Sequence, residues 1–338
     1  MSDTDTARPA LSPGPRLAVS KGLMTIGSAT VLLFVVSALA AHSSVSPTSL
    51  RSMLQIAAVL AVAGLGQMLV IQQGGIDLSV AGAMSMAVVV VTHIPDGNNG
   101  KLVPAVLVAL LFALGAGVLN GFLVGVLQLN AIIATLGTNA LLYGADLSIS
   151  GGRPRITTKL LASVTGGTSA GIPHAVWFAL GALVVVSVLV RRTVAGRRFE
   201  AIGANPRAAR VAGLRVRGHQ ASAYLYAQVL YCLAGVMLAG ITAQPSAFEG
   251  DSFLLISVAV VVLGGTSLLG GRGYPLATVV AAIFLEQLVQ FVVALGVSTA
   301  VQTIVQAVAL AIGVSLYTVN WKALRSRRPG LRGTPAPA

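Results

Sequence analysis

Long apolar runs recur along almost the whole of this chain, and they constrain its fold more than any other feature. Runs of about 18 or more predominantly apolar residues alternate with short polar segments from Met24 onward. An α-helix needs ~20 such residues to cross the hydrocarbon core of a bilayer. Only 9% of the 338 residues are charged, against roughly 25% in soluble domains, and the mean hydropathy is +0.87. The sequence therefore predicts an all-α, polytopic transmembrane helical bundle.

The runs predict ten membrane spans. Their approximate bounds are Met24–Ala41, Met53–Ile71, Leu78–Ile94, Leu102–Leu129, Ala131–Ile149, His174–Val190, Ala221–Ile241, Phe253–Leu269, Pro275–Ala294 and Ala300–Val319. The run Leu102–Leu129 is longer than one membrane thickness, so this helix must tilt, bend or project.

Basic residues set the orientation of the spans. With ten spans and an internal N-terminus, 17 of the 22 lysines and arginines lie in internal segments and 5 in external ones. Cytoplasmic loops of membrane proteins carry such an excess of Lys and Arg. We therefore expect both termini in the cytoplasm. The net charge of +13 is explained by this orientation, and we expect no nucleic-acid partner because aromatic residues make up only 5%.

The two ends of the chain are polar. Residues 1–23 contain three prolines, and we expect a disordered cytoplasmic tail there and a basic cytoplasmic tail at 321–338, with the transmembrane domain at 24–320. The first apolar run ends in Ala38-Leu-Ala40, which resembles a signal-peptidase site. That run is longer than the ~7–15 residues of a signal-peptide core, so we expect a retained first span.

The segment from Arg191 to Gln220 is the longest polar interval between two apolar blocks, and it carries eight arginines. Asn205 is a good N-cap and Pro206 suits the first helical position. Gly213 suits the left-handed conformation that ends a helix. We expect a short capped helix in a cytoplasmic loop, and a helix this short is stable only when it rests against something.

Two glycine-rich turns interrupt the apolar pattern, at Gln72–Val80 and Gly264–Gly273. Each can expose backbone groups at a helix break beside a cavity, as in transporters. Alternatively, Asp77 and Ser79 cap the span that follows them. Neither turn has the lysine of a phosphate-binding loop, so a nucleotide site in this chain is not expected.

Glu286 lies near the middle of the span Pro275–Ala294 and is followed by Gln287 and Gln290. A central charge costs roughly 2.5–3.5 kcal/mol on insertion scales, so it should face protein or water. It is either part of a polar cavity wall or proton relay, or a buried glutamate bonded to a neighbouring helix. The same alternatives apply to Gln67, Asn139, Gln302 and Gln306, whereas we expect Asp146 to be solvated near the outer end of its span.

Residues that could bind a metal, form a disulfide or act in catalysis are few in this sequence. The four histidines lie near predicted span ends without partners at metal-ligand spacing, and Cys232 is the only cysteine. We expect no metal site, no disulfide within the chain and no catalytic residues. Glycines within the spans fit close helix packing, namely Gly64 and Gly66, Gly115 and Gly117, and Gly121 and Gly125. The last pair has a small-x-x-x-small spacing, which is common in membrane helices.

Four motifs, in this order and spacing, resemble the membrane permease subunit of bacterial ribose-type ABC importers over roughly residues 24–320. They are Gly74-Gly-Ile-Asp-Leu-Ser-Val80, Ala134-Thr-Leu-Gly-Thr138, Ala201-Ile-Gly-Ala-Asn-Pro-Arg-Ala-Ala-Arg-Val-Ala-Gly-Leu-Arg-Val216 and Leu263-Gly-Gly-Thr-Ser-Leu-Leu-Gly-Gly-Arg-Gly273. The sequence departs from the family at Ala81, usually glycine, at Gln72-Gln73 and at Glu286-Gln287. These departures bear on the solute more than on the mechanism.

The resemblance implies a multi-pass protein of the bacterial inner membrane with three kinds of protein partner. These are a separate cytoplasmic ATPase that binds ATP and Mg, a periplasmic solute-binding protein and a second permease copy. Lipid surrounds the chain, and no cofactor is expected in the chain itself. The residues that the resemblance assigns to ATPase coupling are Glu200, Gly203, Asn205, Pro206, Arg207, Ala208, Ala209, Arg210 and Gly213. The residues that we expect beside the translocation path are Gly74, Gly75, Asp77, Asn139, Gly264, Gly265, Thr266 and Glu286.

We therefore expect a non-catalytic permease that carries a sugar or sugar-like solute by alternating access. Nucleosides and branched-chain amino acids are alternative solutes for such a permease. A different class of protein, a proton-coupled secondary transporter with Glu286 as its proton site, stays open from the residues alone, as does an intramembrane enzyme or scaffold.

Overall fold

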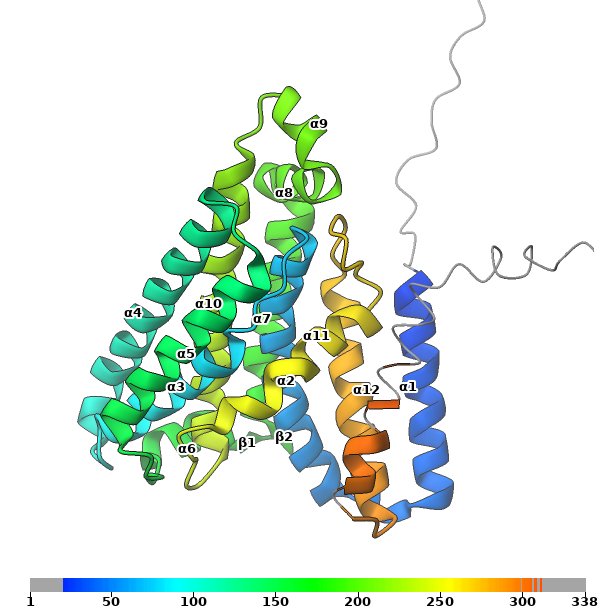
Figure 1. Ribbon diagram of the computed structural model, residues 1–338. Helices are drawn as coiled ribbons and strands as arrows, with labels where there is room; N and C mark the ends of the chain where they lie inside the picture. Colours follow the sequence, from blue (N-terminus) through cyan, green and yellow to red (C-terminus); the bar gives the residue numbers. More distant parts are fainter. Residues whose placement is uncertain (1–20, 299, 306, 309–310, 312–338) are drawn as a thin grey trace, which may run out of the picture.

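A computed structural model of the chain describes residues 21–298, 300–305, 307–308 and 311, and these are almost entirely helical (Figure 1). The long helices are α1 (Lys21–Ala40), α2 (Pro47–Gln72), α3 (Val80–His93), α4 (Leu102–Asn120), α5 (Ala131–Ser150), α7 (His174–Arg192), α10 (Val216–Ile241), α11 (Phe253–Leu263) and α12 (Pro275–Ala294). Shorter helices are η1 (His42–Val45), η2 (Asn99–Lys101), η3 (Gly121–Val126), α6 (Lys159–Gly166), α8 (Val194–Ala204), α9 (Pro206–Val211) and η4 (Glu249–Ser252). A small antiparallel hairpin joins β1 (Thr168–Ser169) to β2 (Ile172–Pro173).

Seven helices of the described residues are long and apolar enough to cross a membrane. They are Gly22–Ala40, Pro47–Gln72, Asn99–Val126, Ala131–Ser150, His174–Arg192, Val216–Ile241 and Pro275–Ala294. Each coincides with one of the ten predicted spans. The prediction of an all-α polytopic bundle is confirmed.

Two further predicted spans are helices that are too short to cross alone. α3 has 14 residues and α11 has 11, which is about 21 Å and 17 Å at 1.5 Å per residue. We predicted that the second of these would reach Leu269, but α11 ends six residues earlier because Gly265 adopts a φ of 86° that stops the helix. The tenth predicted span, Ala300–Val319, lies largely outside the described residues, as do both predicted tails apart from residues 21–23, where α1 has already begun.

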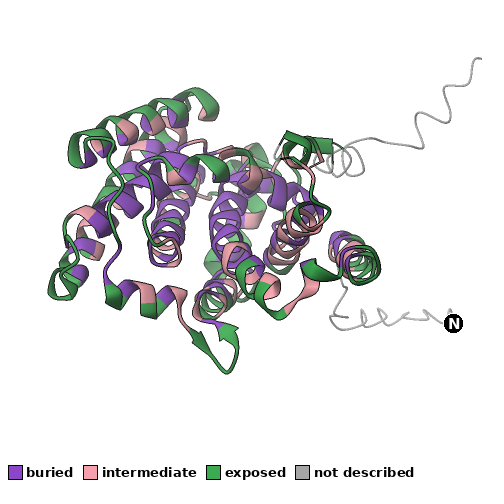
Figure 2. Cartoon of the chain, turned by 90° about the horizontal axis from the view of Figure 1, so that it is seen from below, coloured by how far each residue is buried: buried purple, intermediate pink, exposed green. Residues whose placement is uncertain are grey.

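α2 stands in the centre of the bundle and packs against α7, α10, α11 and α12. Every residue of α2 from Ala57 to Gln72 is buried, as expected for a helix surrounded by other helices, and Figure 2 shows the buried residues concentrated on the inner helices. α10 packs against α2, α3 and α4 on the other side. α1 lies at the edge, where it contacts chiefly α12, and its Ser37 hydroxyl accepts a hydrogen bond from Gln287 at 3.0 Å.

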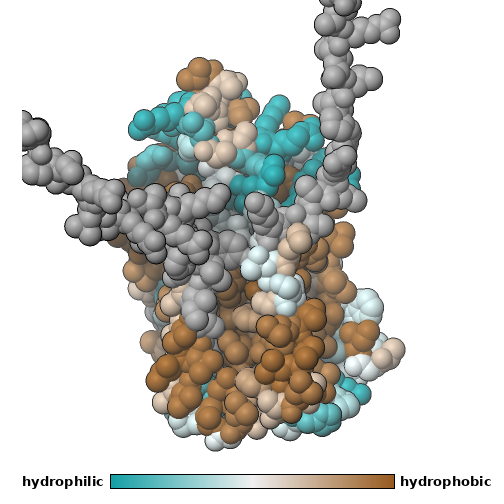
Figure 3. Space-filling model, turned by 90° about the vertical axis from the view of Figure 1, so that its right-hand side faces the viewer, coloured by the Kyte–Doolittle hydropathy of each residue, from teal (hydrophilic) through white to brown (hydrophobic). Residues whose placement is uncertain are grey.

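Apolar side chains cover the outer face of the bundle, whereas hydrophilic ones gather at the end that carries α8 and α9 (Figure 3). The exposed large hydrophobic residues include Leu107, Leu111, Leu141, Val184 and Leu255. In water such an extended apolar surface would drive association. It suits the hydrocarbon core of a bilayer instead.

Close packing of small residues is confirmed where α4 meets α10. The helix continues beyond Asn120 as η3, a wider π-type turn, before the chain leaves the bundle. A Cβ atom added at Gly121 or Gly125 would lie 2.8 or 2.5 Å from the backbone of Ala221, so only glycine permits this approach. Gly115, which we also expected to pack closely, instead faces open space at the surface between α4 and α5.

Candidate functional site

The polar interval predicted to be cytoplasmic forms one end of the molecule and contains two helices, α8 and α9 (Figure 1). The predicted capped helix is confirmed as α9, since the Asn205 side chain accepts hydrogen bonds from the amides of Arg207 at 3.1 Å and Ala208 at 3.0 Å. It ends at Val211, and Gly213 adopts a φ of 79°. The interval is shorter than predicted because α7 extends to Arg192 and α10 already begins at Val216.

α8 was not predicted, although the sequence carries a signal for it. The Thr193 hydroxyl caps its first turn by accepting from the amide of Gly196 at 3.0 Å. Phe199 and Ile202, three residues apart, are buried on one face. Ile202 packs with Ala209 and Val216 in a small apolar cluster separate from the main core. α8 and α9 therefore form one packed unit.

The surface of this unit is strongly basic. Eight exposed arginines lie on α8 and α9 and on the adjoining ends of α7 and α10: Arg191, Arg192, Arg197, Arg198, Arg207, Arg210, Arg215 and Arg217. Val211, at the tip of α9, is 91% exposed. A capped helix with an exposed apolar residue and a basic rim, held away from the bundle, has the features of a docking surface for another protein.

α8 touches both glycine-rich turns at once. The amide of Gly271 donates to the carbonyl of Gln72 at 2.9 Å, and Gly203 packs against the same carbonyl. We call these three residues, Gln72, Gly203 and Gly271, the glycine junction. A Cβ atom at position 203 would lie 2.0 Å from the Gln72 oxygen and 3.2 Å from the Gly271 nitrogen. The junction therefore excludes every side chain at position 203.

Two polar contacts reinforce the glycine junction. The side-chain amide of Gln73 donates through Nε2 to the backbone carbonyl of Phe199 at 2.8 Å. Arg272 donates through Nε to Glu200 at 2.6 Å. The hydrogen bond and charge of Glu200 raise the pKa of Arg272 above its ordinary value, so this guanidinium stays charged. Predicted coupling residues Glu200 and Gly203 thus contact the bundle, whereas α9 leaves Arg207, Arg210 and Val211 exposed.

The residues predicted beside the path fall into four places. Gly74, Gly75 and Asp77 form the turn that enters the bundle between α2 and α3, and Gly264, Gly265 and Thr266 form the turn between α11 and α12. Asn139 lies on α5, where its side-chain oxygen accepts from the amide of Gly82 at 2.8 Å. Glu286 lies on α12, apart from these contacts. The structure joins the two turns through the glycine junction but does not gather all eight residues at one site.

Asp77 is fully buried and holds the first turn in place. Its carboxylate accepts from the Ser79 amide at 2.9 Å and from the Ser79 hydroxyl at 2.5 Å. The Asp77 carboxylate thus caps the amide of Ser79, the residue before α3, whereas the Ser79 side chain, the other predicted cap, makes no capping bond to α3. Gln228 of α10 donates to the second carboxylate oxygen at 3.3 Å and to the Ser79 hydroxyl at 2.7 Å.

This buried polar network extends further than the sequence suggested. Asn120 of α4 donates to the Ser79 hydroxyl at 2.8 Å and accepts from Thr138 of α5 at 2.6 Å. The Tyr231 hydroxyl of α10 lies 2.6 Å from the side-chain amide of Gln67 on α2, and the amide orientation that also bonds the Asp77 backbone makes Gln67 the donor. Asn120 and Gln228 were missed, although each is a polar residue inside an apolar run and carries the same signal as Gln67.

Unpaired polar groups cluster around the two turns. The side-chain amide of Gln72 and the hydroxyls of Tyr224 and Thr266 are buried and have no hydrogen-bond partner in the described part of the chain. Buried polar groups are otherwise nearly always bonded.

Glu286 and Gln287 have different environments. Gln287 is fully buried and makes the bond to Ser37 of α1. Glu286 is half-buried and takes part in no hydrogen bond or ion pair within the described ranges. The bond to a neighbouring helix that we considered for the glutamate is made by the glutamine beside it.

The prediction that Asp146 is solvated was wrong. This residue is fully buried, on the same face of α5 as Thr138 and Leu142, because α5 continues to Ser150 and packs against α3 and α4. Neither carboxylate oxygen has a hydrogen-bond partner among the described residues.

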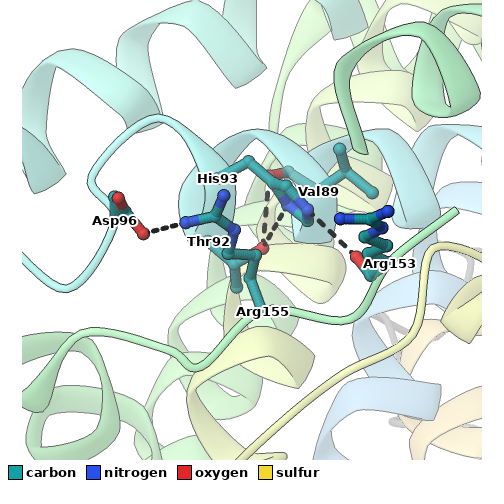
Figure 4. A network of polar contacts seen from close by, with 6 residues as sticks. All are labelled: Val89, Thr92, His93, Asp96, Arg153 and Arg155. Atoms are coloured by element: carbon teal, nitrogen blue, oxygen red, sulfur yellow. Dashed lines mark hydrogen bonds and ion pairs between the residues drawn. The ribbon is translucent and has the colours of Figure 1, made fainter. Parts of the chain in front are cut away.

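At the end of the bundle away from α9, α3 is fastened to the segment that follows α5 (Figure 4). The Nε2 atom of His93 contacts the carbonyl of Arg153 at 3.0 Å, and Nδ1 of the same ring lies 3.1 Å from the carbonyl of Val89. Asp96 forms an ion pair with Arg155. These contacts fix the lower end of α3 while its upper end is held by Asp77.

A protein-family model matches residues 49–314, which is more than three quarters of the chain. Its description is "Branched-chain amino acid transport system / permease component". The chain belongs to this permease family. The permease is accordingly a multi-pass integral protein of the bacterial inner membrane, as its seven long apolar helices also require.

Several curated proteins resemble this permease along most of their length. A probable ABC transporter permease of Sinorhizobium fredii is 31% identical over 278 residues, which cover 82% of this chain and 83% of the relative. The ribose import permease of Bacillus subtilis is 33% identical over 275 residues, or 80% and 84%. The autoinducer 2 import system permease of Escherichia coli is 33% identical over 266 residues, or 77% and 76%. No solved structure matches the permease.

Proposed function

We propose that this chain is the transmembrane permease subunit of an ATP-binding-cassette importer for a sugar or sugar-like solute. The relatives named for ribose and autoinducer 2 support an importer of small polyhydroxylated solutes. The family description names branched-chain amino acids, but the curated relatives above do not, so the sugar is favoured. ATP hydrolysis, with its Mg, belongs to a separate subunit, and this chain does no chemistry.

The observation that carries the proposal is the position of the α8–α9 unit. A capped basic helix stands clear of the bundle, and the helix before it contacts both glycine-rich turns through the glycine junction. An ATPase that binds α9 and moves it would therefore move Gly203 against Gln72 and Gly271. The first turn joins α2 to the short helix α3 and the second follows the short helix α11, so their displacement would open or close the bundle.

The orientation follows from the same surface. The eight arginines of the α8–α9 unit lie in the cytoplasm if the positive-inside rule holds. Ten spans then put both termini in the cytoplasm as well. A periplasmic solute-binding protein delivers the solute to the opposite end, and a second permease copy completes the path.

The test is purification of the tagged full-length chain from its host in mild detergent, with identification of the co-purifying proteins. We expect an ATPase subunit. A variant in which residues 205–213 are replaced by a flexible Gly-Ser linker of equal length should lose it. Proteoliposomes of the purified complex should then hydrolyse ATP faster when the binding protein and a sugar are added than with a branched-chain amino acid or a nucleoside.

A chain that purifies alone and accumulates solute under a proton gradient without ATP would overturn the proposal. In that case Glu286 becomes the residue to substitute. The link through α8 has its own check, because Glu200→Arg breaks the ion pair to Arg272 and Arg272→Glu in the same chain restores it. Recovery of uptake in the double variant supports the transmission of movement through α8. An equal loss of uptake in the single and the double variant contradicts it.

A further inference from the structure

A groove of about 490 Å³ lies between the end of α7, the start of α8 and the first half of α10. Its volume is in the range of ~300–1,000 Å³ that is usual for ligand sites. The inner wall is apolar and buried, with Val186 and Val190 on α7, Phe199 on α8 and Leu69 on α2. This groove is separate from the two turns and from the docking face of α9.

The groove opens sideways, toward the bilayer. On its rim, Val185 is 56% exposed, Leu189 50% and Tyr226 51%. Along α10 its lining extends over residues 218–230, which is about 18 Å at 1.5 Å per residue. Half of a ~30 Å hydrocarbon core is about 15 Å, so the groove matches the depth of one leaflet.

The polar end of the groove is basic. Arg215, His219 and Ser222 line it where α10 leaves the membrane. The Nδ1–H of His219 donates to the carbonyl of Arg215 at 2.9 Å, which directs Nε2 outward. The two ion pairs of the described residues join Arg155 to Asp96 and Arg272 to Glu200. The Arg215 guanidinium is therefore available for an anion.

From this arrangement we infer that the groove binds one phospholipid with an anionic headgroup. An acyl chain lies along the apolar wall, and the phosphate contacts Arg215 and His219. Basic pockets between transmembrane helices on the cytoplasmic side recognise such headgroups. The assignment to the inner leaflet rests on the proposed orientation, whereas the lipid class rests only on the groove.

Other occupants fit the groove less well. A sugar would leave its hydroxyl groups unpaired against valine, leucine and phenylalanine. A second copy of the chain would bring another basic α8–α9 unit against this one, and like charges repel at an interface. An anionic lipid satisfies both the apolar wall and the unpaired cation.

The test uses the purified full-length chain, with lipid retention measured by native mass spectrometry. Phosphatidylglycerol is titrated against phosphatidylcholine with identical acyl chains. We expect tighter retention of phosphatidylglycerol, and a loss of this preference in Arg215→Ala with His219→Ala. Loss of the Arg215 charge should by itself weaken retention about fivefold. Ala195→Trp, at an exposed lining position, should fill the groove and weaken retention of both lipids.

The matched control is Arg217→Ala, which removes the same charge from the same helix outside the groove and should retain phosphatidylglycerol like the parent chain. Equal losses in Arg215→Ala and Arg217→Ala would indicate diffuse surface charge and overturn the site. Unchanged lipid retention in both Ala195→Trp and the Arg215–His219 variant would also overturn the site. The same holds if Ala195→Trp changes the oligomeric state of the chain but not the amount of lipid that it retains. None of these readouts depends on transport, so the lipid site and the importer function can fail separately.

Discussion

Replacement of Gly203 by alanine tests the glycine junction most directly. The added Cβ atom would lie 2.0 Å from the Gln72 oxygen. An ordinary carbon–oxygen contact is about 3.4 Å, so α8 must move by about 1.4 Å relative to α2. Overpacking of this kind costs about 1–3 kcal/mol. Displacement of the bond from the Gly271 amide, now 2.9 Å long, adds about 0.5–1.5 kcal/mol.

The expected consequence is loss of coupling rather than loss of fold, because the clash lies between α8 and the turns and not within the core. A penalty of about 2 kcal/mol on the state in which α8 is packed against the two turns lowers the population of that state about 30-fold. Solute uptake and ATP hydrolysis should be measured in the same proteoliposomes at matched permease levels. We expect hydrolysis to persist while the solute moved per ATP falls at least about tenfold.

The matched control is Gly181→Ala. This glycine lies in α7, and a Cβ atom there would meet nothing within 4 Å. Its substitution should leave both activities at the parent level. An unchanged ratio of solute to ATP in Gly203→Ala, at normal membrane levels, would refute the argument that α8 transmits force through the junction.

The other predictions concern the cap, the helix stop and the buried network. Asn205→Ala removes two hydrogen bonds from the first turn of α9, which lowers the stability of this helix by about 1 kcal/mol. Less ATPase should then co-purify with the chain. Asn205→Asp keeps a capping oxygen and should retain the ATPase. Gly213→Val places a β-branched residue at a φ of 79°. It should uncouple transport with normal membrane insertion, and normal uptake would remove α9 from the coupling assignment. Asp77→Ala leaves the Ser79 amide and the Gln228 side chain short of an acceptor. It should destabilise the chain by about 1–3 kcal/mol, seen as a lower melting temperature in detergent, and no shift would contradict the structural role of this carboxylate.

The sequence by itself determined the class of fold. Apolar runs predict helices because the backbone must satisfy its hydrogen bonds within each segment in lipid, and seven of these predictions correspond to long helices. Local chemistry was sufficient for α9, since an Asn-Pro pair and a glycine stop act on their own neighbours. The same holds for the Asp77 carboxylate, because the amide and hydroxyl of Ser79 that donate to it lie two residues away.

The tertiary structure alone decided which distant residues meet. Nothing local indicates that Gly203 closes on Gln72 and Gly271, because that contact depends on how α8 folds back onto two turns far apart in the sequence. Burial was likewise unpredictable for Asp146, whose exposure depends on the helices that cover α5. Helical periodicity gives the face of a residue but not the neighbour on that face, and the neighbour determines whether a polar side chain is solvated, bonded or left unpaired.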